Sequence, residues 1–232
     1  MWYFINKIVY INLDGREDRR QIMQKLFEEG KIPPEKIQRF SAIKHEIGII
    51  GCGMSHIGVL KLAKANNWKN VLIMEDDAEW VDFQTNYEKL EKLINEKFDV
   101  FMLGGFYSEN TNLRVTNTFG AHAYIVKNHY YDILLGNLQE GLSRRLDVYV
   151  RPFPRETKKQ RYSELVKSRN EFNNDIYWWK LQEKDTWIAM IPSMCNQAIT
   201  YSDNSNKMSP SHINIDVEML KTYSKTLISR MS

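Results

Sequence analysis

An apolar run that leads directly into three carboxylates constrains this chain more than any other feature. Residues 71–74 are Val, Leu, Ile and Met, and Glu75, Asp76 and Asp77 follow them. Such a run is typical of a strand buried on both faces, as in a parallel sheet covered by helices. Open α/β sheets bind their ligands outside the carboxyl ends of the strands, which is where these acids stand. The sequence therefore predicts an α/β fold with a ligand site after this strand.

Three adjacent carboxylates repel one another, so we expect a counter-charge beside them. A divalent cation with oxygen ligands, Mg²⁺ or Mn²⁺, suits the triplet best. Side chains alternate along an extended chain, which predicts Glu75 and Asp77 on one face and Asp76 on the other. Taken alone, an acidic triplet is more typical of a solvated turn, but the strand before it and the motifs described below favour a ligand site.

Size and composition favour one globular domain over residues 1–232. Hydrophobic residues make up 43% of the chain and charged residues 26%, and the net charge of +3 is too small to indicate a nucleic-acid partner. Two cysteines form no disulfide framework, so we expect a reducing location, the cytoplasm of a bacterium or of a virus-infected host. Residues 1–10 lack the pattern of a signal peptide, and no apolar run reaches the length of a membrane span. Membrane contact is therefore expected to be peripheral or through a partner.

Strand and helix patterns alternate along the chain, which indicates a layered, mostly parallel sheet. The expected strands are residues 7–13, 37–42, 71–74, 98–103 and 121–126. The expected helices are residues 17–30, 55–66, 82–95, 129–138 and 215–231.

One segment differs in composition from the rest. Residues 151–170 carry seven Lys/Arg against two Asp/Glu and contain two prolines, which predicts a basic loop or insertion around residues 151–174. A solvated surface segment is the plainer interpretation, and a polyanion-binding segment is a rival that the small net charge weakens.

A polar segment follows the first expected strand. Residues 12–20 read Asn-Leu-Asp-Gly-Arg-Glu-Asp-Arg-Arg. Backbone amides at a helix start and arginine side chains suit a diphosphate, so the segment is typical of a nucleotide site. In the alternative, Asp14 caps the helix and the arginines are solvated.

A glycine-rich stretch, residues 48–56, precedes the second expected helix. It lacks the Lys-Ser/Thr pair of a P-loop, and its glycines permit close approach of the backbone to a bound group. We expect Cys52 to be a small packed residue, because Cys52 and His56 alone make a poor zinc site. Ser55 is expected to cap the helix, and His56 is either structural or part of the site.

Together these motifs resemble glycosyltransferase family 25, which includes bacterial lipopolysaccharide galactosyltransferases and collagen galactosyltransferases. The resemblance rests on the segment after the first strand, on Ile-Gly-Cys-x-x-Ser-His at residues 50–56 and on the Glu-Asp-Asp triplet. Further matching segments are residues 98–104, 120–126, 146–149 and 192–203.

The resemblance implies a GT-A type fold, with a Rossmann-like, mostly parallel central sheet flanked by helices. It also implies an inverting transfer of a hexose, galactose or glucose, from a UDP-sugar to a glycan or glycoprotein acceptor. The implied cofactor is Mn²⁺ or Mg²⁺, which stabilises the departing diphosphate.

The resemblance also assigns roles to residues. Asp147 is the expected general base, with Asp175 in reserve, although Asp147 beside Arg144 and Arg145 also fits an ordinary exposed carboxylate. The expected metal ligands are Asp77, Glu75, Asp203 and His212, and the expected donor-binding residues are Asn12, Leu13, Asp14, Arg16, Arg19, Ser55, His56, Glu75, Asp76 and Gln197.

Two other classes of function remain open on the sequence. The first is a catalytically silent protein that binds a nucleotide sugar or serves a structural role on the same fold. The second is a magnesium-dependent phosphotransferase that uses the acidic triplet, for which the chain shows no P-loop.

Overall fold

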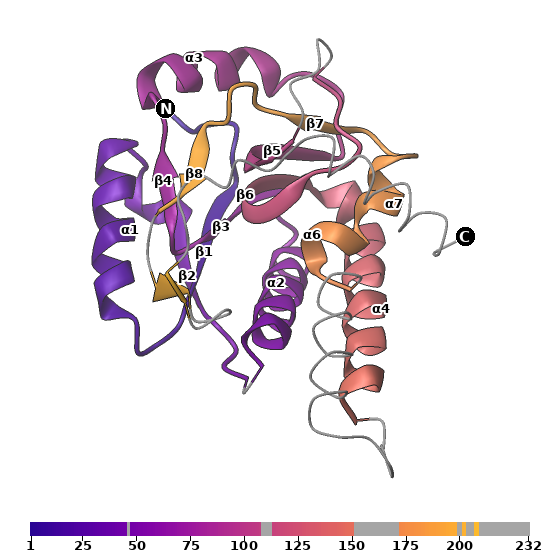
Figure 1. Cartoon of the computed structure of the whole chain (residues 1–232). Helices are drawn as coiled ribbons and strands as arrows, with labels where there is room; N and C mark the ends of the chain where they lie inside the picture. Colours follow the sequence, from indigo (N-terminus) through magenta and orange to yellow (C-terminus); the bar gives the residue numbers. More distant parts are fainter. Residues whose placement is uncertain (46, 108–112, 151–171, 199–200, 203–206, 209–232) are drawn as a thin grey trace.

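The computed structural model describes residues 1–45, 47–107, 113–150, 172–198, 201–202 and 207–208. An eight-stranded sheet lies between two layers of helices (Figure 1). The predicted helix at residues 215–231, Asp203, His212 and most of the basic insertion lie outside the described residues.

The strands of the main sheet stand in the order β2-β1-β3-β6-β5-β8-β4, and β7 pairs with β5. Six of these eight strands run in one direction, whereas β4 and β6 run in the other. The prediction of an α/β fold with a mostly parallel sheet flanked by helices is confirmed. The strands are β1 Lys7–Asn12, β2 Ile37–Ser41, β3 Asn70–Glu75, β4 Ala78–Trp80, β5 Val100–Phe106, β6 Phe119–Lys127, β7 Trp187–Ala189 and β8 Cys195–Gln197, and a separate pair is formed by β9 Tyr201–Ser202 and β10 Lys207–Met208.

Helices cover both faces of the sheet. Along β3, Val71 and Ile73 pack with the face covered by α2 and α4, and Leu72 and Met74 pack with the face covered by α1 and α3. This alternation explains the continuous apolar run, because each face needs its own apolar side chains. The helices are α1 Glu17–Glu29, α2 Gly48–Ala65, α3 Phe83–Leu93, α4 Tyr131–Val150, α6 Asn174–Tyr177 and α7 Trp179–Gln182, with short 3-10 turns at η1 Pro34–Lys36 and η2 Asn128–Tyr130.

The second helix begins seven residues earlier than expected, and the glycine-rich stretch is its first part. A Cβ on Gly51 would stand 2.3 Å from the Ile43 carbonyl oxygen, so the glycine lets the preceding loop pack against the helix. Ser55 is not the helix cap. Its hydroxyl donates to the Gly51 carbonyl at 2.7 Å and accepts from the Ile43 amide at 2.8 Å. Gly51 therefore serves helix–loop packing in the described structure.

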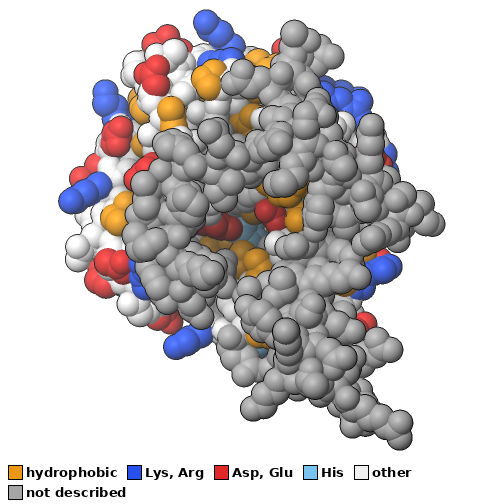
Figure 2. Space-filling model, viewed as in Figure 1, with side chains coloured by type: hydrophobic (Ala, Val, Ile, Leu, Met, Phe, Trp, Pro, Cys, Tyr) orange, Lys and Arg blue, Asp and Glu red, His pale blue; other side chains and the backbone are white. Residues whose placement is uncertain are grey.

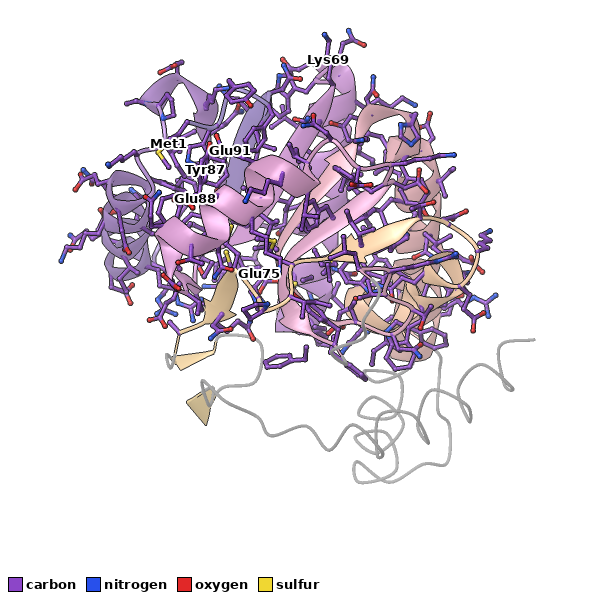
Figure 3. All side chains as sticks on the ribbon, turned by 90° about the horizontal axis from the view of Figure 1, so that it is seen from above. Met1, Lys69, Glu75, Tyr87, Glu88 and Glu91 are labelled. Atoms are coloured by element: carbon purple, nitrogen blue, oxygen red, sulfur yellow. The ribbon has the colours of Figure 1, made fainter. Side chains whose placement is uncertain are left out.

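The N-terminal segment is tied to both helices of one layer. Trp2 is fully buried; its backbone N–H donates to the Tyr87 hydroxyl at 2.6 Å, and its indole N–H donates to the Gly30 carbonyl at 2.8 Å. Met1 and Tyr87 accordingly lie close together in Figure 3. The segment thus joins α3 to the end of α1.

Among the helices of the described residues, none has the length and apolar character that crossing a bilayer requires.

Candidate active site

The polar residues of the site gather at one edge of the sheet because the strands that carry them are parallel. β1 and β3 pair in parallel, so Asn12 at the end of one strand lies beside the acidic triplet at the end of the other. β6 runs the opposite way, and it therefore begins at this same edge. Figure 2 shows acidic side chains and a histidine gathered near the middle of one face of the molecule.

Asp76 points toward α1 and is held by two polar side chains. The Asn12 amide donates to Asp76 Oδ2 at 2.7 Å, and Arg19 Nη1 lies 2.5 Å from Asp76 Oδ1. All three residues are buried. Burial raises the pKa of Asp76 despite the Arg19 charge. All three are predicted donor-binding residues, and the structure brings them together.

Arg39 connects Asn12 to Asp14. Its Nε donates to Asn12 Oδ1 at 2.9 Å, and its Nη2 forms an ion pair with Asp14. Ser41 adds a hydrogen bond to Asp14 Oδ1 at 2.8 Å. The contact with Arg39 lowers the pKa of Asp14. Asp14 is therefore bonded to side chains of β2 and does not cap α1.

Glu75 points to the opposite face, toward α2. His56 Nε2 lies 3.2 Å from Glu75 Oε1, Cys52 Sγ lies 3.9 Å from the same oxygen, and Gln197 Nε2 lies 3.5 Å from Oε2. Burial acts to raise the pKa of Glu75, but the hydrogen bond and charge of His56 outweigh it and lower the pKa. Burial and the Glu75 charge raise the pKa of the Cys52 thiol.

A line of aromatic rings leads from His56 into the core. His56 Nδ1 lies 2.8 Å from the Tyr124 hydroxyl, and the two rings stack with centroids 5.8 Å apart. Tyr124 meets Trp178 edge-on at 5.5 Å, and Trp178 lies 5.1 Å from Trp187. The packed rings fix the orientation of the histidine.

Asp77 is the least compensated acid of the triplet. Arg19 Nη1 lies 3.6 Å from its Oδ2, and its buried Oδ1 accepts no hydrogen bond from the described residues. Burial, together with the neighbouring Glu75 charge, raises the pKa of Asp77 to about 7. A buried carboxylate oxygen without a donor, next to a second carboxylate, fits a hard divalent cation.

Asp175 lies in α6, which packs against β6. The Gly120 amide donates to Asp175 Oδ2 at 2.9 Å, and Gly120 has the positive φ of 82° that favours glycine. Burial raises the pKa of Asp175, and the Glu75 charge adds to the rise. The reserve residue is thus electrostatically linked to the acidic triplet.

Other predicted residues lie elsewhere. Asp147 is exposed on α4, whose lower part extends away from the sheet in Figure 1. Arg16 forms an ion pair with Asp18 at 2.8 Å, Leu13 is half-buried, and Ser55 is bonded within α2 and to its preceding loop. Asp203 and His212, the expected further metal ligands, lie outside the described residues.

Neither Arg39 nor the approach of Cys52 to Glu75 was predicted from the sequence. Arg39 acts through Asn12 and Asp14, and only the parallel pairing of β1 with β2 brings it there. Cys52 and His56 stand four residues apart on α2, and this spacing places them on one helix face. The spacing was visible in the sequence, but the carboxylate opposite was not.

The segment that carries the acidic triplet is similar to a known protein family. The model of glycosyltransferase family 25 (LPS biosynthesis protein) matches residues 47–134. Residues 47–134, called the family 25 segment below, are therefore similar to that family. The family 25 segment runs from the start of α2 into the first turn of α4, so it contains Cys52, His56 and the whole acidic triplet.

The chain is similar to one viral protein and to several solved structures. "Putative glycosyltransferase R655" of Acanthamoeba polyphaga mimivirus is 30% identical over 119 residues, which are 42% of this chain and 37% of that protein. The chain thus spans little more than a third of the length of this relative. The solved structure of A197 from STIV is 11% identical, with a TM-score of 0.44, and the match covers 90% of this chain and 96% of that one. The structure of a glycosyltransferase involved in the glycosylation of the major capsid of PBCV-1 is 13% identical, with a TM-score of 0.41, and the match covers 70% of this chain and 89% of that one.

Proposed function

We propose that this protein is a glycosyltransferase that moves a hexose, galactose or glucose, from a UDP-sugar to a hydroxyl of a glycan or glycoprotein. One observation carries the proposal: the family 25 segment places three carboxylates at the carboxyl edge of an α/β sheet, and the Asp77 Oδ1 atom there is buried without a donor. Nucleotide ligands of such sheets bind at this edge.

The two faces of the triplet suit different parts of the donor. Asp76, Asn12 and Arg39 form a connected polar network at the ends of β1 and β2, and its polar groups suit the hydroxyls of a ribose and the edge of a base. Asp77 and Glu75 suit Mn²⁺ or Mg²⁺, which when bound would stabilise the negative charge of the departing diphosphate. Asp203 and His212 stay predictions as further ligands.

Asp175 is the better general base of the two carboxylates that the sequence offered. A general base works best with a pKa near the operating pH, and burial raises the pKa of Asp175 in that direction. One of its oxygens accepts the Gly120 N–H, and this bond fixes the carboxylate. In the proposed reaction Asp175 takes the proton of the acceptor hydroxyl while that oxygen attacks the anomeric carbon. The bond from that carbon to the diphosphate breaks, and the configuration inverts.

The first experiment is a panel of nucleotide sugars with manganese, scored by release of nucleotide diphosphate and by the anomeric configuration of the product. We expect release from one UDP-hexose and an inverted product. A retained configuration would contradict the general-base mechanism, and the absence of release from every donor would contradict the proposed activity.

The second experiment separates the two candidate bases. Asp175→Asn is expected to lower kcat by about 10²- to 10⁴-fold, the usual contribution of general-base catalysis, whereas Asp147→Asn leaves it unchanged. The reverse result would make Asp147 the base. Circular dichroism of both variants shows whether the fold is intact.

The third experiment concerns the cation. Activity is expected to disappear in a chelator and to return with Mn²⁺, and Asp77→Asn is expected to abolish this return. Binding of Mn²⁺ to the protein, followed by electron paramagnetic resonance, provides a readout that needs no donor. Full activity in the chelator would contradict metal dependence.

A further inference from the structure

Three ligand atoms of different chemistry converge beside the predicted donor site. Cys52 Sγ, His56 Nε2 and a Glu75 carboxylate oxygen all lie within 4.8 Å of one another. The shorter separations are 3.2 Å from His56 Nε2 to Glu75 Oε1 and 3.9 Å from Cys52 Sγ to the same oxygen. We infer that these residues form a binding site for a zinc-class divalent cation.

Two of the three separations are close to those of a tetrahedral zinc site. Zn²⁺ binds nitrogen and oxygen at about 2.0–2.2 Å and sulfur at about 2.3 Å, which places tetrahedral ligand atoms about 3.3 to 3.6 Å apart. The observed 3.2 Å and 3.9 Å lie on either side of these values, so small side-chain rotations suffice. Three protein ligands leave the fourth position open, as in catalytic and exchangeable zinc sites.

Rigid elements hold the three ligands in place. Cys52 and His56 stand four residues apart on one face of α2, and Glu75 ends β3, against which α2 packs. The Tyr124 hydroxyl lies 2.8 Å from His56 Nδ1. When Nδ1 donates its proton to Tyr124, the lone pair of Nε2 is available to a cation, and this is the usual arrangement around a metal-bound histidine.

The ligand set separates this site from the hard-cation site predicted at Asp77. Thiolate and imidazole favour Zn²⁺ and Co²⁺, whereas carboxylate and water oxygens favour Mg²⁺ and Mn²⁺. The two sites share Glu75. If the proposed glycosyl transfer is correct, zinc at this site withdraws Glu75 from the donor site, and Zn²⁺ acts as an inhibitor of transfer.

Co²⁺ titration of the full chain tests the site directly. We expect one equivalent of Co²⁺ to give tetrahedral absorption bands and a thiolate-to-cobalt charge-transfer band in the near ultraviolet, which Zn²⁺ then removes. Cys52→Ser should abolish the charge-transfer band, and Cys195→Ala, which changes the other free cysteine, should keep it. A wild-type spectrum without the thiolate band would overturn the inference.

Affinity measurements sharpen the test. Competition with a chromophoric chelator measures the Zn²⁺ affinity. We expect this affinity to fall by more than about 100-fold in Cys52→Ser and His56→Gln, which lose a ligand. In Tyr124→Phe, which loses only the hydrogen-bond partner of a ligand, the affinity should fall by about 10- to 100-fold. Unchanged affinity in Cys52→Ser would overturn the site. Should a variant not fold, alkylation of wild-type Cys52 decides: Zn²⁺ must protect it, and equal labelling with and without Zn²⁺ refutes the site.

The two proposals fail in different ways. If no UDP-sugar is turned over but the cobalt spectrum shows thiolate ligation, the glycosyl-transfer proposal fails and the zinc site stands. If transfer occurs and the spectrum lacks the thiolate band, the zinc site fails and the transferase stands.

Discussion

Asp77 retains its proton to a higher pH in the folded protein than an exposed aspartate does. Its burial and the Glu75 charge raise its pKa to about 7, from an ordinary value of 3.8. Between these two pH values the unfolded chain releases a proton that the folded chain keeps. The free energy of unfolding therefore falls as pH rises from about 4 to 7 in the absence of a cation.

Asp77→Asn removes this pH-dependent loss in the free energy of unfolding. We predict that in a chelator the variant is more stable than the wild type at pH 8, by up to about 4 kcal/mol at 1.36 kcal/mol per pKa unit, and that the difference vanishes near pH 4. Urea denaturation at several pH values measures it. Asp147→Asn, which changes an exposed aspartate, serves as the control and should have little effect. A variant less stable than the wild type at pH 8 would contradict the prediction.

Gly104 cannot accept a side chain, because a Cβ there would stand 2.4 Å from His122 Nε2 and 2.6 Å from the Cys195 carbonyl oxygen. Gly104→Ala should destabilise the protein by about 1–3 kcal/mol through overpacking. Gly136→Ala is the matched control. Its Cβ has no neighbour within 4 Å on an exposed face of α4, so it should stabilise by about 0.5–1 kcal/mol. Thermal unfolding measures the stability of both variants. Equal changes in stability would show that Gly104 does not make the close contacts described here.

At the scale of elements, a buried polar network ties the start of β6 to α7. Gln182 Nε2 donates to Thr118 Oγ1 at 2.6 Å, and its Oε1 accepts the Thr118 amide at 3.0 Å. The Trp179 indole donates to the Thr118 carbonyl at 2.8 Å. Gly120, which holds Asp175, follows two residues later, so the network positions the proposed base.

Gln182→Leu leaves two buried groups of Thr118 without partners. We predict a loss of about 2–6 kcal/mol in unfolding free energy, at about 1–3 kcal/mol for each group. Gln84→Leu, on an exposed face of α3, should change it by less than about 0.5 kcal/mol. Chemical denaturation of the two variants distinguishes the cases, and a similar small effect in both would rule out a structural role for the network.

Elements with a strong local pattern were predictable, whereas elements that depend on distant partners were not. The strand at residues 71–74 and the helix at residues 17–30 appear as β3 and α1 with shifts of about one residue. By contrast, β4, β7 and β8 have three residues each and exist only through pairing with distant strands. The early start of α2 also escaped prediction, because its glycines depress helix propensity and only the packed loop compensates.

At the scale of the molecule, the N-terminal segment joins two helices that are distant in sequence. Trp2 is buried against Trp80, Phe83 and Tyr87 and bonds to the end of α1. Trp2→Ala should cost about 3–5 kcal/mol, the usual loss for a large buried aromatic side chain. Tyr3→Ala, at a residue 75% exposed, should cost little. Calorimetry of both variants measures the difference, and a small loss in Trp2→Ala would contradict this account.

The sequence predicted that residues of the candidate site lie at one edge of the sheet, but not the full set of contacts among them. The rule that ligands bind at the carboxyl ends of strands correctly brought Asn12, Arg19 and Asp76 together. The same rule does not predict the place of Arg39, because that depends on the register between β1 and β2. It also does not predict that Cys52 approaches Glu75, because that depends on how α2 packs on the sheet.

The line of rings from His56 through Tyr124 to Trp178 and Trp187 has an optical consequence. Indole emission responds to nearby charge, and both tryptophans are fully buried, so bulk solvent does not obscure the response. Charge that enters or leaves at His56 and Glu75 should therefore alter the intrinsic fluorescence of the unlabelled protein, and the occupancy of the site by a cation or donor becomes visible in real time.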